Sequence, residues 1–397
     1  MVKLVDIEIL DQIKPVYIEQ YYKKLWINVF LEGKPLGRMQ YNISKINIKK
    51  IEPEQIRKDI LESFSDKMWE HLILNKYLPA KIENHNDHKI SVVICTKDRA
   101  AYLRQCLSSL MKVSYSNFEV IVVDNKSEDK SIQRIVNEFE YKYVREDNLG
   151  LNFARNRGIK ESSGDIIAYI DDDADASKNW LKQISIAFDN PDVMAVTGLI
   201  LPAEINEKAQ YNFEKYGGMS KGFTEKYISL YRVKPPELFW ASGWGVGANM
   251  AFRRDIFDRI GNFNLSLDLG TPTCGGGDIE FFFRLVSAGY SLHYVPSAYI
   301  KHYHRRENKA LSKQILNNGK SFPAYLMTIY KQNEQYRKSI IWFFIYNWVF
   351  QWLILNLIKS IIRLDITRLK FAISEIAGSL FSYTSFKRSL KSINLNS

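Results

Sequence analysis

The sequence predicts an α/β protein built on a mostly parallel β-sheet with helices on both faces. Three observations predict this class. The runs 90–95, 118–123 and 166–170 are apolar throughout, as in strands that are buried on both faces. The stretch from Leu103 to Met111 repeats apolar residues at helical spacing. Strands that alternate with such helices are typical of parallel sheets, whose carboxyl ends meet at one ligand-binding edge.

Residues 1–86 differ from this pattern. Short alternating patches separated by glycine and proline turns predict antiparallel strands at 16–22, 25–33 and 39–51. The segment 52–73 then has helical periodicity, and a polar linker follows at 83–89. We therefore expect a small β-rich accessory module before the main domain.

Composition limits the classes of protein. The chain has 397 residues, enough for two or three domains, and its formal net charge of +11 indicates an anionic partner such as nucleic acid, a membrane or a phosphate-bearing substrate. Cys95, Cys106 and Cys274 lie far apart and suit a reducing compartment. Asp6 and Glu8 interrupt the first apolar stretch, so we expect no cleaved signal peptide.

Polar residues follow each predicted strand of the main sheet. They are Thr96, Asp98 and Arg99, then Asp124 and Asn125, then Asp171, Asp172 and Asp173. Three adjacent carboxylates repel one another, and a divalent cation such as Mg²⁺ or Mn²⁺ is the simplest remedy. The alternative is that these acids only cap the helices that follow.

Further downstream, three features can serve the same edge. Asn152 and Arg155 lie near the start of a predicted helix, where an arginine suits phosphate oxygens. Asp278 follows three glycines in the first turn of another helix and could be a general base or a cap. The glycine-flanked Trp240 and Trp244 form either a platform for a sugar ring or part of the core.

One histidine pair closes the pattern. His302 follows a predicted strand and could give a metal a nitrogen ligand, or it could be structural. His304 competes with it, and spacing alone does not separate the two.

The order of these motifs over residues 90–305 resembles the family 2 glycosyltransferases of GT-A fold, a Rossmann-like arrangement. The motifs are TKDR, VDN, NLGLNFARNRG, IDDD, GGGDIEF and PSAYIKH. The resemblance implies that a sugar moves from a nucleotide-diphosphate donor with inversion, aided by Mn²⁺ or Mg²⁺. Gly277 precedes Asp278 where the family commonly has a glutamate, so the base assignment rests on Asp278 and the following Glu280.

The resemblance also implies roles for individual residues. Asp278 would be the catalytic base, and Asp173, Asp171 and His302 would hold the metal. By the resemblance, Asp98, Asp124, Arg155, Asp171 and Asp172 would belong to the donor site. From their places at strand ends and a helix start, we also expect Thr96, Arg99, Asn125 and Asn152 there, and we expect Trp240, Trp244 and Glu280 to face the acceptor.

The end of the chain carries an apolar segment. Residues 340–358 are uncharged and are flanked on both sides by basic residues. We expect a helix that lies in the membrane interface, with a single span or a buried core helix as alternatives. The expected domains are thus an accessory module at 1–86, a catalytic domain at 87–310 and a helical, membrane-associated region at 311–397.

Together these expectations describe an enzyme of surface polysaccharide synthesis. We expect a glycosyltransferase that is cytoplasmic and peripheral on the inner face of the cell membrane. Its donor would be a nucleotide-diphosphate sugar, with a UDP-sugar foremost, and its acceptor a glycan or lipid-linked molecule. No nucleic acid is expected, because the charge is spread along the chain. A nucleotidyltransferase and a non-catalytic carbohydrate-binding protein are the alternatives.

Overall fold

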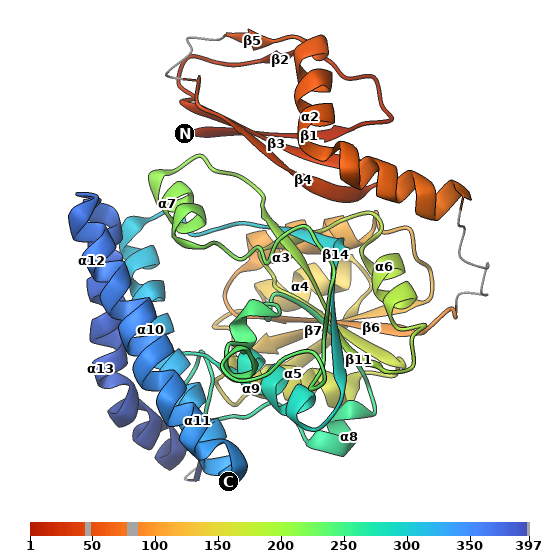
Figure 1. Cartoon of the computed structure of the whole chain (residues 1–397). Helices are drawn as coiled ribbons and strands as arrows, with labels where there is room; N and C mark the ends of the chain where they lie inside the picture. Colours follow the sequence, from red (N-terminus) through yellow and green to blue (C-terminus); the bar gives the residue numbers. More distant parts are fainter. Residues whose placement is uncertain (44–48, 78–85, 395–397) are drawn as a thin grey trace.

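The computed structural model describes residues 1–43, 49–77 and 86–394. Its centre is a nine-stranded sheet in the order β10-β14-β11-β13-β9-β6-β7-β8, with β12 paired to β14 (Figure 1). The strands are β6 (Ile90–Thr96), β7 (Phe118–Asn125), β8 (Lys142–Glu146), β9 (Ile166–Ile170), β10 (Ala174–Ala176), β11 (Val193–Pro202), β12 (Lys226–Ile228), β13 (Asn249–Arg253) and β14 (Ser291–His302). All but β10, β12 and β13 run in the same direction.

Helices cover both faces of this sheet. Along β6, Val92 and Ile94 face the core layer under α3, α4 and α6, whereas Val93 faces the layer under α5 and α9. These helices are α3 (Ala100–Leu110), α4 (Ser131–Glu138), α5 (Leu151–Glu161), α6 (Trp180–Ala187) and α9 (Gly277–Ser287). The uniformly apolar strands are buried on both sides for this reason, and the expected fold class is confirmed.

Strand β13 runs against its neighbours β9 and β11. Its first residue, Asn249, pairs with Ile170 at the end of β9, so β13 starts at the carboxyl edge. The connection from β11 to β13, residues 203–248, includes α7 (Lys208–Tyr216) and begins at that same edge, where β11 ends. Residues 245–248 therefore lie beside the end of β9, where a ligand site is expected.

The N-terminal module is a three-stranded sheet covered by one helix. Its order is β1 (Val2–Glu8), β3 (Lys24–Leu31) and β4 (Lys34–Tyr41), and α2 (Pro53–Leu72) buries Ile56 and Ile60 against it. The expectation of antiparallel strands is correct for β3 with β4 and for the short strands β2 (Val16–Tyr17) and β5 (Lys50–Ile51). Strand β1 lies outside the expected strands and runs parallel to β3. The connection between β1 and β3 is long enough to return the chain to the same end. Residues 44–48 of the third patch and 83–85 of the linker lie outside the described residues.

This module rests on the end of β14 and on α7 (Figure 1). Asp6 Oδ2 lies 2.6 Å from Lys301 Nζ, and the N–H of Val2 donates to the carbonyl of Ile205 at 3.1 Å. Phe30 packs against Tyr299 with ring centroids 5.2 Å apart. The module is thus attached to the strand that ends in His302.

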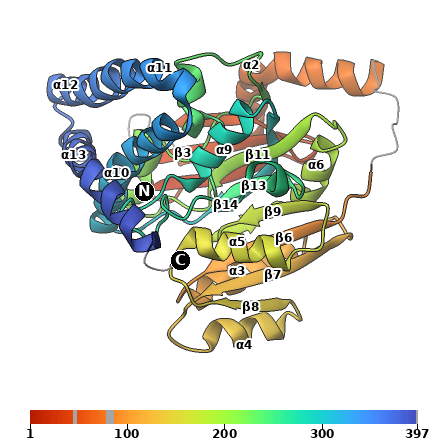
Figure 2. The ribbon, with the colours of Figure 1, turned by 90° about the horizontal axis from the view of Figure 1, so that it is seen from below.

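Helical segments form the C-terminal region, seen beside the sheet in Figure 2, and a short turn of helix, η4 (Glu334–Tyr336), joins α10 to α11. The long helices α10 and α13 approach closely at two glycines. A Cβ on Gly319 would lie 2.2 Å from the carbonyl oxygen of Glu375, and one on Gly378 would lie 2.1 Å from that of Leu316. The segments are α10 (Asn308–Gln332), α11 (Arg337–Trp342), η5 (Phe343–Ile354), α12 (Leu355–Ile362) and α13 (Ile366–Asn394).

One helical stretch in the described residues, Glu334–Ile362, is long and apolar enough to cross a membrane by length and composition. Only 28% of its most apolar window is buried inside the protein, which does not suit the alternative of a core helix. Its inner side chains, such as Phe343 and Trp348, pack on the main core, while Trp342, Ile345 and Phe350 are exposed.

Candidate active site

The three aspartates lie where β9 ends and turns into β10. Strand β10 pairs antiparallel with β14 in a register that sets Ala174 opposite His302. His302 Nε2 consequently lies 3.0 Å from Asp173 Oδ1 and 3.8 Å from Asp171 Oδ2. One possible ligand atom from each of these residues lies within 4.8 Å of the others. The strand pairing therefore brings together the three residues expected to hold a metal.

The donor set suits Mn²⁺ or Mg²⁺. Two carboxylates and one imidazole are ligands that such cations accept. His302 is buried, and its Nδ1 has no hydrogen-bond partner among the described residues. Burial alone would lower the pKa of His302, but its contacts with Asp171 and Asp173 raise it to about 9. The same carboxylates that hold this proton could hold a divalent cation in its place.

Asp172 faces away from this set. Its carboxylate accepts a hydrogen bond from Thr96 Oγ1 at 2.7 Å and pairs with Arg99 Nη1 at 2.9 Å. Arg99 also lies 2.8 Å from Asp173. Burial raises the pKa of Asp172 to about 6, although Arg99 opposes the shift. Thr96 and Arg99, both expected in the donor site, thus brace the aspartate turn.

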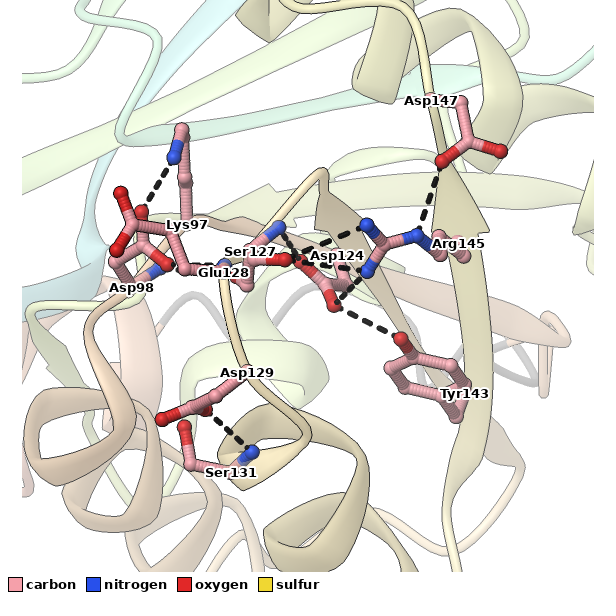
Figure 3. Close-up of polar contacts among 10 residues, drawn as sticks. All are labelled: Lys97, Asp98, Asp124, Ser127, Glu128, Asp129, Ser131, Tyr143, Arg145 and Asp147. Carbon is pink, nitrogen blue, oxygen red and sulfur yellow. Dashed lines mark hydrogen bonds and ion pairs between the residues drawn. The ribbon is translucent and has the colours of Figure 1, made fainter.

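The ends of β6 and β7 form a second polar group (Figure 3). Asp124 is buried, and its oxygens accept from the N–H of Ser127 at 2.9 Å and from the hydroxyl of Tyr143 at 2.8 Å. Arg145 lies 3.4 Å from the same carboxylate. Sequence patterns did not indicate Tyr143 or Arg145, and their spacing on one side of β8 is the signal that could have done so.

Asp98 is more open than Asp124. Its backbone has a φ of 55°, its side chain is 39% exposed, and it pairs with Lys97. One oxygen accepts from the N–H of Glu128 at 2.8 Å (Figure 3). Asp98 and Asp124 are therefore both joined to the loop after β7, but only Asp98 has a substantial free surface.

Two polar side chains at the start of α5 line a cavity of about 480 Å³ at the carboxyl edge. Asn152 donates to the carbonyls of Asn264 and Leu267 at 2.8 and 2.9 Å. Arg155 is buried and donates to Asn152 Oδ1 at 3.2 Å. Asn125 lies behind them, where its Oδ1 accepts from the N–H of Gly150 at 2.8 Å.

Asp278 lines the same cavity as Asp171 and Arg155. It lies in the first turn of α9, and its Oδ2 accepts from the N–H of Gly247 at 2.8 Å. A Cβ on Gly247 would lie 2.5 Å from Arg155 Nη2 and 3.0 Å from Asp278 Oδ2, so glycine permits this approach. Lys221, which sequence patterns did not indicate, also lines the cavity. Burial lowers its pKa, and the charge of Asp278 opposes that shift.

The structure separates the three residues expected to face the acceptor. Trp240 lines the cavity. Trp244 does not, because it is buried in the core. Glu280 is also buried and is held by Arg284 at 3.0 Å, on the side of α9 away from the cavity. The sequence places Trp240 close to Trp244 and Asp278 close to Glu280, but in each pair only the first residue lines the cavity.

Comparisons with known proteins agree with this architecture. Residues 91–261 match the family model described as glycosyl transferase family 2. A glucosyl-dolichyl phosphate glucuronosyltransferase of Haloferax volcanii is 26% identical over 188 residues, which are 44% of this chain and 56% of the relative. Glycosyltransferase AglE of the same organism is 27% identical over 233 residues, covering 57% of this chain and 70% of AglE.

A solved mannosyltransferase of Pyrobaculum calidifontis, in complex with GDP-Man and Mn²⁺, aligns with 81% of this chain and 96% of its own length, at 14% identity and a TM-score of 0.49. The family model and both curated relatives are glycosyltransferases, and the chain spans 56% of the first relative's length. The chain therefore carries a domain of the glycosyl transferase family 2 type at residues 91–261.

Proposed function

We propose that the chain is a metal-dependent, inverting glycosyltransferase that moves a sugar from a nucleotide-diphosphate donor to a hydroxyl group of a glycan or lipid-linked acceptor. One observation carries the proposal. A single cavity is lined by Asp171, which belongs to the group of possible metal ligands, and by Asp278, a carboxylate on a separate helix. A direct displacement needs both, because the leaving group and the attacking hydroxyl lie on opposite sides of the sugar.

Asp171, Asp173 and His302 would hold the cation. When bound, Mn²⁺ or Mg²⁺ supplies positive charge that stabilises the departing diphosphate. Arg155 adds a fixed positive charge on the same cavity wall. Asp98, with its partly exposed carboxylate, is the best placed of the strand-end residues to accept hydrogen bonds from the nucleoside.

Asp278 would act as the general base. A sugar hydroxyl is a poor nucleophile at neutral pH, so its proton must be removed as it attacks. Asp278 Oδ2 already accepts the N–H of Gly247, which orients the carboxylate toward the cavity. Attack from this side, opposite the diphosphate, inverts the configuration of the anomeric carbon.

Two further observations bear on the acceptor and the location. The relative whose name includes a dolichyl phosphate supports a lipid-linked acceptor. The exposed apolar side chains of Glu334–Ile362 support attachment to the cytoplasmic face of a membrane. On this proposal the module at 1–86, the catalytic domain at 87–310 and the helical region at 311–397 are the functional divisions, and synthesis of a surface polysaccharide is the role.

The test is calorimetry with a panel of nucleotide diphosphates and nucleotide sugars, each with and without Mn²⁺. We expect one nucleotide, UDP in the first place, to bind only when metal is present, and Asp173→Ala to lose that dependence. Metal-independent binding by the unmodified protein would contradict the metal site. Transfer of a nucleotidyl group, detected by mass spectrometry of the products, would favour a nucleotidyltransferase instead.

A further inference from the structure

The cavity is also lined by residues that, apart from Trp240, have no role in the proposal above. Residues from four segments meet there: Tyr216 at the end of α7, Trp240 before β13, Trp352 on η5 and Glu375 on α13. Trp352 and Glu375 lie outside the 91–261 family match. The C-terminal helices thus complete the cavity that the proposed base also lines.

Glu375 is a buried carboxyl group whose surroundings are unusual. It is 5% exposed, and its Oε2 accepts the hydroxyl of Tyr216 at 2.8 Å. Among the described residues, no Lys, Arg or His side chain forms an ion pair with it. Burial raises its pKa. A buried carboxyl without a cation is costly unless it has hydrogen-bond partners, and a ligand in the cavity can supply them.

The close approach of α10 and α13 sets the position of this carboxyl. Gly319 on α10 faces the backbone of Glu375, where a Cβ would come within 2.2 Å of its carbonyl oxygen. Without side chains at Gly319 and Gly378, α13 packs against α10 and brings Glu375 to the cavity wall.

Aromatic rings flank the carboxyl. Trp240 and Trp352 are both partly exposed, and their ring centroids lie 5.6 Å apart at an interplanar angle of 60°. The side chain of Trp352 also lies beside Glu375, and hydrogen bonding from it lowers the pKa of that carboxyl group against the effect of burial. Trp348, in contrast, is buried and stacks on Phe322 at 4.4 Å, so it supports the wall. Indole faces beside hydrogen-bonding groups are the combination that binds the apolar face and the hydroxyls of a sugar ring.

We propose that Tyr216, Trp240, Trp352 and Glu375 form the subsite for the acceptor sugar, and that this sugar is a neutral pyranose. The inference rests on the proposed function and names its acceptor class. A neutral ring can stack on the indoles and share hydroxyl protons with Glu375. An acidic sugar would place a second negative charge beside Glu375 and Asp278. The phosphate of a lipid-linked acceptor would then lie outside this subsite.

The first experiment measures binding of the acceptor without catalysis. Saturation-transfer NMR is recorded on the full chain with Mn²⁺ and UDP, using octyl β-D-glucopyranoside, octyl β-D-galactopyranoside and octyl β-D-glucuronide as probes. We expect at least one neutral glycoside to bind and the glucuronide not to bind. Binding by none of the neutral glycosides, or preference for the glucuronide, would overturn the inference.

Variants then locate the bound sugar. Glu375→Gln and Trp352→Leu are expected to weaken binding of the neutral glycoside about tenfold or more, while the Kd for UDP with Mn²⁺ stays unchanged. If Glu375→Gln does not fold, Tyr216→Phe replaces it, because it removes only one hydroxyl from the same subsite. Ser382→Ala, at a buried serine further along α13 that does not line the cavity, is the matched control.

The two proposals fail in distinguishable ways. If UDP binds with Mn²⁺ but glycoside binding is unaffected by Glu375→Gln, Tyr216→Phe and Trp352→Leu, the acceptor subsite is wrong and the donor site remains. If glycosides bind but no nucleotide does, the proposed transferase mechanism is wrong.

Discussion

Arg38 of the N-terminal sheet and Glu214 of α7 form a buried ion pair 3.2 Å apart. The other oxygen of Glu214 lies 3.0 Å from His304 Nε2. One carboxylate therefore joins the accessory module to the chain just beyond His302. On the near side of His302, Lys301 is paired with Asp6 of the same module. The module thus fixes the strand end that carries a proposed metal ligand from both sides.

The first prediction concerns this attachment. Arg38→Ala leaves the Glu214 carboxylate buried with only His304 as its charged partner, so we expect the free energy of unfolding to fall by about 3 kcal/mol. Chemical denaturation at neutral pH measures this change. Lys3→Ala, which removes an exposed ion pair within the module, is the control and should cost less than about 1 kcal/mol. Equal effects of the two substitutions would contradict a structural role for the buried pair.

The pH dependence of stability follows from the same carboxylate. Burial alone would raise the pKa of Glu214, but His304 and Arg38 lower it below its ordinary value of 4.5. A lowered pKa means that the stabilisation is complete above about pH 4.5 and is lost as the pH falls through the folded-state pKa. Glu214→Gln should therefore be less stable at pH 7 and should lose less stability on acidification. Parallel acid-unfolding curves for the two proteins would show that Glu214 does not contribute in this way.

A third prediction separates the two neighbouring histidines. Because His302 contacts Asp171 and Asp173 whereas His304 contacts Glu214, we expect His302→Ala to abolish the effect of Mn²⁺ on nucleotide binding. His304→Ala should lower the melting temperature but keep the Mn²⁺ dependence. Calorimetric titration of Mn²⁺ with the nucleotide present measures both. Loss of the dependence in His304→Ala alone would reverse the assignment.

The fourth prediction concerns the base. Asp278→Asn should bind the donor with an unchanged Kd, yet the rate of transfer should fall by about 10²–10⁴-fold, the usual contribution of a general base. Glu280→Gln is a matched carboxyl-to-amide change on the same helix, outside the cavity. It should destabilise the protein through the loss of the Arg284 pair but leave the rate per folded molecule within about tenfold. Full turnover by Asp278→Asn would remove it as the base.

The fifth prediction concerns the apolar helix. Trp342, Ile345 and Phe350 are 65%, 56% and 46% exposed. Their triple substitution by serine should reduce binding to phosphatidylglycerol-containing vesicles at least about tenfold, because each apolar side chain loses its transfer free energy. Tyr231→Ser, at a residue that is 94% exposed elsewhere in the chain, should not change vesicle binding. Binding that survives the triple substitution would place membrane attachment elsewhere.

Much of the fold could be predicted from local patterns, because strands buried on both faces and amphipathic helices have distinct signals. Strand β1 could not, since Asp6 and Glu8 hide its apolar residues. Both acids have partners that only the tertiary structure brings near. Asp6 contacts Asn28 and Lys301, and Glu8 accepts from the N–H groups of Glu32 and Gly33. The reversed direction of β13 depends on where its preceding excursion ends, which no local pattern records.

The candidate site shows the same division. The aspartate cluster and Asp278 could be predicted because motif order marks strand ends and a helix start. The choice between His302 and His304 depends on the register of β10 with β14, which spacing does not determine. Glu375 carried no signal at all, because it lies in a helix without a motif and reaches the cavity only through the close packing at Gly319.

That glycine contact has a mechanical consequence. The backbones of α10 and α13 are in contact at Gly319 and Gly378. The two helices therefore have little freedom to slide past each other and behave as one rigid unit. This rigid pair carries Glu375 at the cavity. The segments η5 and α12, with their exposed apolar side chains, pack against α13. If a membrane binds those apolar side chains, the distance between the membrane surface and the cavity is therefore fixed. On the proposed function, the C-terminal helices would fix the distance between such a surface and Asp278, the proposed base.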